Sequence, residues 1–190
     1  MRKILIIFIV LLPFMAISEP FSEDTLKHFV GVSYSGLSAS GITYKYYLNQ
    51  RTAFKIAGYA FYKLQTDGAD NDEKGDIQYD LGVEFQSFLM KSRYARLYGL
   101  IGIKKMLLKS YPNDVYEPDL EMKDKYGIGV GVGIELSPQT KSSTFSPTLI
   151  IDIGEIFFNE EEVETWGSQK DSKSFVGFNF SGTIGIGIQF

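Results

Sequence analysis

Several residue types that carry chemistry or cross-links are absent or scarce in this 190-residue chain. It contains no cysteine, one histidine (His28), one tryptophan (Trp166) and only 6 prolines. The absence of cysteine excludes disulfides, thiolate nucleophiles and cysteine metal sites. Basic residues are also outnumbered, with 19 Lys and Arg against 23 Asp and Glu, so the chain is a poor candidate for binding nucleic acid.

Long hydrophobic runs are missing everywhere except at the N-terminus. There, Arg2 and Lys3 precede an apolar stretch over residues 4–15, and small residues follow it. A basic start, a short apolar core and small residues are typical of a secretory signal peptide, and the stretch is too short to span a membrane. We therefore expect residues 1–18 to be a signal peptide and residues 19–190 to form one domain.

The rest of the chain alternates between apolar and polar residues with a period of two, and a helical period is almost absent. This pattern predicts β-strands, and the segment ending in IGIGIQF is its most regular example. We expect eight strands, an even number, over residues 28–36, 41–48, 52–64, 77–89, 94–107, 126–136, 145–158 and 175–190.

The lengths of the connections also form a pattern. Connections after the second, fourth and sixth expected strands are short, whereas residues 65–76, 108–125 and 159–174 form long polar ones that we expect to be loops. An up-and-down meander would place the long loops at one end and the short turns with both termini at the other. The long loops hold fifteen of the 23 acidic residues, which are Asp67, Asp70, Asp72, Glu73, Asp76, Asp114, Glu117, Asp119, Glu121, Asp124, Glu160, Glu161, Glu162, Glu164 and Asp171.

The two faces of the expected strands differ in chemistry. One stripe is mainly Ile, Val, Leu, Phe and Tyr, and the other is mainly Gly, Ser, Thr, Gln and charged residues. Backbone groups left unpaired in hydrocarbon cost several kcal/mol each, so a sheet in a membrane must close on itself. Aromatic residues also recur near the expected strand ends, as in membrane barrels with two aromatic girdles: Tyr34, Tyr62, Tyr79, Tyr126 and Phe178 toward the long loops, and Tyr46, Phe54, Phe145 and Phe190 toward the short turns. The sequence therefore predicts an all-β fold, an eight-stranded antiparallel up-and-down transmembrane β-barrel.

With these features the chain resembles the small eight-stranded outer-membrane barrels of the OmpA, OmpX and opacity-protein type. The resemblance covers the whole mature chain and lies in its architecture and in its C-terminal pattern. It implies location in a bacterial outer membrane, contact with outer-membrane lipid and lipopolysaccharide, and recognition by the barrel-assembly machinery. The residues that match the C-terminal assembly signal of that family are Phe180, Ile184, Ile186, Ile188 and Phe190, with Gly182 interrupting the pattern.

Charged residues on the inward stripe are balanced in sign. We assign Lys45, Lys55, Arg96 and Lys104 to the lumen together with Asp80, Glu84, Glu135 and Asp152. Four charges of each sign are what burial requires, because removing one partner of a buried pair costs about 3–5 kcal/mol. Arg96 and Glu135 fall at similar heights on neighbouring strands, so we expect them to pair. An eight-stranded barrel is just wide enough for side chains to fill, so a packed structural plug is favoured over a gated ion path.

Other functions remain open at this stage. A lipid-modifying outer-membrane enzyme would need a histidine with acidic or hydroxyl partners near the external rim, and His28 is expected at the opposite end. A secreted lipocalin-like barrel would point its apolar face inward. We expect a non-enzymatic, monomeric membrane barrel without cofactor or metal, serving envelope integrity or surface interaction through its acidic loops, where a host or other surface ligand could bind.

Overall fold

The computed structural model describes residues 26–66, 73–92, 94–111, 120–138 and 144–190. The expected signal peptide lies outside these residues, as do Asp67, Asp70, Asp72, Asp114, Glu117 and Asp119 of the expected acidic loops. Among the described residues no helix is both long and apolar enough to cross a membrane.

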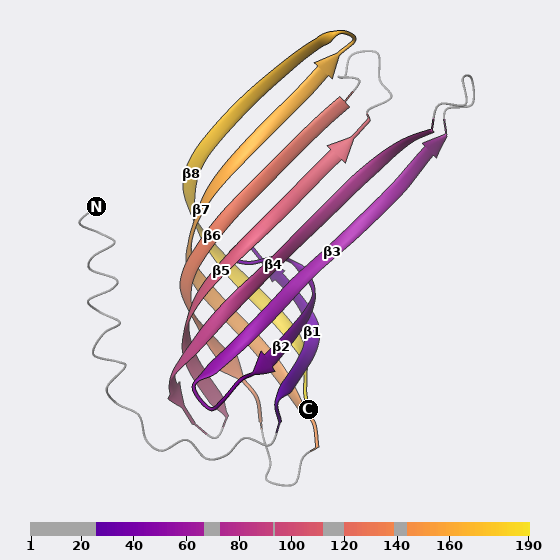
Figure 1. Cartoon of the computed structure of the whole chain (residues 1–190). Helices are drawn as coiled ribbons and strands as arrows, with labels where there is room; N and C mark the ends of the chain where they lie inside the picture. Colours follow the sequence, from indigo (N-terminus) through magenta and orange to yellow (C-terminus); the bar gives the residue numbers. More distant parts are fainter. Residues whose placement is uncertain (1–25, 67–72, 93, 112–119, 139–143) are drawn as a thin grey trace, which may run out of the picture.

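Eight antiparallel strands follow one another around a closed ring, each paired with its neighbours in the sequence (Figure 1). The ring closes where the last strand pairs with the first, through partners such as Val30 and Ile188. The all-β, up-and-down architecture expected from the alternating pattern is thus present. The strands are β1 (His28–Ser35), β2 (Gly41–Tyr47), β3 (Thr52–Thr66), β4 (Glu73–Lys91), β5 (Ala95–Ser110), β6 (Leu120–Leu136), β7 (Ser146–Trp166) and β8 (Gln169–Gln189).

The strands are staggered around the ring. We start at Phe29 on β1 and step each time to the register partner on the next strand, which leads to Asn179 on β8. The partners on the way are Lys45, Lys55, Glu84, Gly102, Gly129 and Ile156. Between β8 and β1, Thr183 pairs with Ser35, and in the same register Asn179 would lie opposite position 39. This position is ten residues beyond Phe29, where the path began. A stagger of this size over eight strands corresponds to a strand tilt of about 40–45°.

The ring is complete only over the short strands β1 and β2. Above them, β3 to β8 continue as an open curved sheet that extends well beyond the β1–β2 hairpin (Figure 1). The pairing of β2 with β3 ends at Gly58, and the pairing of β1 with β8 ends at Thr183. The upper parts of β3 and β8 therefore form two free edges of a six-stranded sheet.

The expectation of three long loops is wrong for most of their described residues. Residues 159–174 form the top of a hairpin whose strands pair up to Trp166 and Gln169, with Gly167 in the turn at a φ of 58°. Trp166, expected in a loop, is the last residue of β7. Residues 120–125 likewise belong to β6. Polarity suggested loops here, but these charged side chains pair with charges on the neighbouring strand, so the sheet continues without an apolar stripe.

Candidate functional site

The eight charged residues assigned to the lumen all point into the ring. Lys45 and Glu135 are fully buried, and the others are buried or nearly so. The structure gathers six of them into two groups near the closed end, Lys45 with Arg96 and Glu135, and Lys55 with Glu84 and Asp152. The remaining two, Asp80 and Lys104, lie higher and form a looser pair with a distance of 3.5 Å between Lys104 Nζ and Asp80 Oδ2.

Glu135 is the centre of the lower group. Its carboxylate accepts hydrogen bonds from Lys45 Nζ at 2.5 Å, from the Tyr47 hydroxyl at 2.7 Å and from Arg96 Nη1 at 2.5 Å. Arg96 and Glu135 are direct register partners on β5 and β6, as their expected heights require. Two cations thus share one carboxylate, which is fully removed from solvent.

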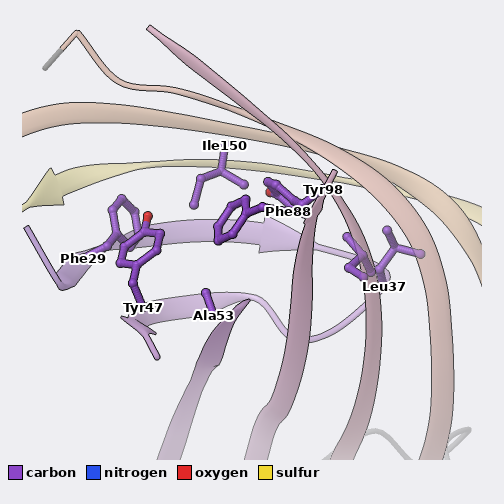
Figure 2. Packing of buried hydrophobic residues seen from close by; sticks show 8 residues of the cluster. Phe29, Leu37, Tyr47, Ala53, Phe88, Tyr98 and Ile150 are labelled. Carbon is purple, nitrogen blue, oxygen red and sulfur yellow. The ribbon is translucent and has the colours of Figure 1, made fainter. Parts of the chain in front are cut away.

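An aromatic layer lies inside the ring next to this group (Figure 2 shows its aromatic side chains). The ring of Phe88 stacks on Tyr47 at 5.9 Å and meets Tyr98 edge-on at 5.7 Å. The Lys45 ammonium lies 4.9 Å from the Tyr47 ring centre and 4.8 Å from that of Tyr98, within range of a cation–π attraction. Ile150 and Phe29 complete the layer.

The upper group reverses the balance of charge. Lys55 Nζ lies 2.6 Å from Glu84 Oε2 and 3.6 Å from Asp152 Oδ2, so one cation faces two carboxylates. The Tyr98 hydroxyl donates to Asp152 Oδ1 at 2.5 Å and thereby joins this group to the aromatic layer. Together the two groups contain three positive and three negative side chains, which is the balance that burial favours.

The connection between β1 and β2 lies inside the lumen above these charges. Leu37, Ser38 and Ala39 are almost completely buried, with exposed fractions of 0%, 1% and 0%. Ser35 Oγ accepts hydrogen bonds from the backbone N–H groups of Leu37 and Ser38, and contacts the Thr183 hydroxyl at 2.6 Å. We call residues 36–40, which join β1 to β2, the inserted loop.

Three inward glycines make room for the inserted loop. A Cβ built on Gly129 would lie 2.4 Å from the Leu37 carbonyl oxygen, and one on Gly82 would lie 3.0 Å from Ala39. On Gly102 it would lie 3.4 Å from the Ser38 Cβ. At this level the space left by the glycines is therefore occupied by the backbone of the inserted loop.

Asp80 fixes the far end of the inserted loop. Its Oδ2 accepts a hydrogen bond from the Ser40 backbone N–H at 3.1 Å and faces Lys104 at 3.5 Å. The Ser40 hydroxyl in turn accepts from the Ser35 N–H at 3.0 Å. The highest pair of the expected charge set therefore positions the inserted loop and does not line an open passage.

Above the ring, charged residues on the lumen side of β6 and β7 form a ladder. Lys125 pairs with Glu160 at 2.6 Å, and Lys123 lies 3.2 Å from Glu162 and 3.3 Å from Glu121. The bonds to Glu162 and Glu121 raise the pKa of Lys123 above its usual value. Glu160 and Glu162, which were assigned to a loop, are thus strand residues paired with lysines across the sheet.

The outer surface carries an apolar stripe on every strand. On β8 it includes Phe180, Ile184, Ile186 and Ile188, whose exposed fractions are 66%, 59%, 62% and 51%. Glu155 on β7 was missed by the sequence analysis and interrupts the stripe between Val130 and Phe180, its register partners. Side chains alternate between the two faces along a strand, and Glu155 has an odd number whereas lumen-facing Asp152 has an even one. This difference predicts that Glu155 faces outward, and it is the signal that could have revealed the residue.

Four of the expected assembly-signal residues, Ile184, Ile186, Ile188 and Phe190, lie along the seam that closes the ring, whereas Phe180 lies above it. Phe190 exchanges two backbone hydrogen bonds with His28, at 2.7 and 2.8 Å, and its ring stacks on the His28 imidazole at 5.5 Å. His28 Nδ1 also contacts the Tyr44 hydroxyl at 2.8 Å. The chain's one histidine is therefore part of an aromatic cluster at the short-turn end, away from the inserted loop.

Comparisons of the chain with protein-family models, curated proteins and solved structures found no match. Within the ranges that the structure describes, no group of three or more His, Asp or Glu residues is arranged to hold a metal ion.

Proposed function

We propose that the chain is an integral β-barrel of a bacterial outer membrane, without catalytic activity, that serves envelope integrity or surface interaction. The observation that carries this proposal is the inverted distribution of polarity. The interior holds fully buried Lys45 and Glu135, whereas large apolar side chains such as Ile186 and Phe178 are 62% and 64% exposed. Such a surface is stable when hydrocarbon replaces water around it.

The height of the apolar stripe supports the same proposal. On β6 it runs from Leu136 to Tyr126 and is followed by Asp124, and on β5 it runs from Leu97 to Ile103 and is followed by Lys105. A strand tilted by about 45° needs about 9–11 residues to cross the hydrocarbon core. On β6 the stripe has this length and on β5 it is shorter, and the rings of Tyr62, Tyr79, Tyr126 and Phe178 fall at its upper limit. Tyr34, expected with them, lies lower because β1 ends one residue after it.

The filled lumen favours a structural role over a channel. The aromatic layer with the lower charge group, then the upper charge group, and then the inserted loop fill the inside of the ring. Leu37 is fully buried in the interior, and Phe88 and Tyr98 are buried side chains in contact, as in a packed interior. The lipocalin-like alternative is disfavoured for a related reason, because its ligand cavity would require an apolar and empty interior.

We assign surface interaction to the six-stranded sheet above the ring, whose strands include described residues of the expected acidic loops. The sheet carries exposed apolar residues, with Val176 86% and Phe61 66% exposed. A lipid-modifying enzyme stays as the second class of function, and lipid A mass analysis of cells with and without the protein would reveal it.

Fractionation combined with electrophoresis tests the proposal. The full chain should be recovered with outer membranes and should migrate differently before and after boiling in detergent, because closed membrane barrels resist unfolding by detergent. Recovery in the soluble fraction without any heat-dependent shift would overturn the proposal and favour the lipocalin-like alternative.

A further inference from the structure

We propose that copies of this protein associate side by side in the membrane, the free upper edge of β3 in one copy pairing with the free upper edge of β8 in the next. The inference rests on the proposed membrane location. It replaces the monomer expected from the sequence.

The free edge of β8 can be traced from its backbone hydrogen bonds. Gly182 accepts a hydrogen bond from the Gly36 N–H at 3.0 Å, and Phe190 bonds to His28. Even-numbered residues of β8 therefore direct their N–H and C=O groups toward β1, in the alternation of an antiparallel ladder. Above Gly182, the groups of Phe180, Phe178 and Val176 point to the same side, where β1 no longer continues.

The edge of β3 has the same character. Tyr47 donates its N–H to Lys27, so odd-numbered residues of β2 face β1 and even-numbered ones face β3. Ile42 pairs with Gly58 as the last partner on that side. By the same alternation, the backbone groups of Ala60 and Tyr62 point outward from a free edge.

The two edges match in height, direction and chemistry. β3 and β8 run in opposite directions, so edges of two upright copies meet as an antiparallel pair. The stagger of the ring places Tyr62 and Phe178 at nearly equal heights above the short turns. Both side chains lie on the outer face and are 63% and 64% exposed, so the pairing would bring two aromatic rings together across the strands.

The position of these edges explains why a strand is the favoured occupant. Ala60 and Phe180 lie at the upper margin of the apolar stripe, where backbone groups without partners cost several kcal/mol in hydrocarbon. An acyl chain can cover the rings but cannot bond the N–H and C=O groups. A β-strand can form these backbone hydrogen bonds, and a second copy of the protein supplies an edge strand whose unpaired groups lie at the matching height.

The absence of cysteine from the chain allows a direct test by disulfide trapping. Two full-length single-cysteine variants, Tyr62→Cys and Phe178→Cys, are produced together in outer membranes and mildly oxidised. The control replaces Tyr62→Cys with Tyr126→Cys, which is exposed at a similar height on β6, away from either edge. A disulfide-linked dimer in the first mixture and none above background in the control is the expected result.

A double variant that carries both Tyr62→Cys and Phe178→Cys separates the alternatives. A disulfide that forms only within one chain would show that the sheet closes on itself, and would overturn the inference. Absence of any dimer from the mixture would overturn it as well and would leave capture of a foreign strand as the alternative. Heat-dependent migration and membrane recovery of the same variants show independently whether the proposed membrane location holds.

Discussion

Arg96 and Glu135 stand directly opposite each other on β5 and β6, and their side chains meet at 2.5 Å inside the ring. The same carboxylate also holds Lys45, so one buried anion supports two buried cations. This arrangement ties three strands together around a centre that solvent does not reach.

Loss of the Glu135 carboxylate should therefore be strongly destabilising. Glu135→Gln removes the carboxylate that the buried side chains of Lys45 and Arg96 share, and we expect a loss of about 3–5 kcal/mol in the free energy of unfolding. Glu162→Gln removes a carboxylate from a partly exposed pair with Lys123 and should cost about 0–1 kcal/mol. Urea titration in lipid vesicles measures the free energy of unfolding of both variants. Equal losses of stability in the two would show that burial of the Glu135 group is not important.

The orientation of β8 can be tested by one pair of substitutions. Ile184 faces outward and is 59% exposed, so Ile184→Lys should cost about 2–4 kcal/mol in a bilayer. Thr183 faces inward and bonds Ser35, and Thr183→Ser keeps that hydroxyl, so its effect should be small. The free energy of unfolding of both variants in lipid vesicles tests this prediction. Equal stability of the two variants would contradict the assignment of the two faces of β8.

The inserted loop should depend on the absence of a side chain at Gly129. A methyl group there would clash with the backbone of Leu37, so Gly129→Ala should destabilise the protein by about 1–3 kcal/mol. Gly99 faces outward, where an added Cβ would meet only the Gly131 carbonyl at 4.0 Å. Gly99→Ala is the matched control and should be close to neutral. If the two variants unfold at the same denaturant concentration, the loop is not packed in the lumen.

The filled lumen predicts the absence of conductance. Protein reconstituted into planar bilayers should produce no stepwise currents, because the buried side chains of Phe88 and Tyr98 fill one level of the interior and Leu37 fills another. Regular current steps from the purified wild-type chain would instead support the narrow-channel alternative.

The sequence predicted the ring well because its signal is local. Alternation in segments such as Tyr126 to Leu136 identified the strand and its faces, and opposite charges at inward positions indicated the Arg96–Glu135 pair. The sheet above the ring was missed because its stability comes from pairs between strands, such as Lys125 with Glu160, which leave no apolar period in either strand.

The inserted loop was missed for a different reason. Its burial depends on gaps at Gly82, Gly102 and Gly129, which lie on three strands distant in sequence. Nothing in the short segment around Leu37 shows where those glycines fall. An apolar residue in a connection between two strands was the one local sign that the loop turns inward.

The central claim is that the apolar stripe faces hydrocarbon while the alternate stripe faces a filled interior. Single spin labels introduced from position 183 to position 188, in a chain without native cysteine, test it most directly in lipid bilayers. We predict that labels at Ile184, Ile186 and Ile188 collide with dissolved oxygen and are shielded from a water-soluble nickel complex, while labels at Thr183, Gly185 and Gly187 are shielded from both. Uniform access of the nickel complex to all six positions would contradict the account.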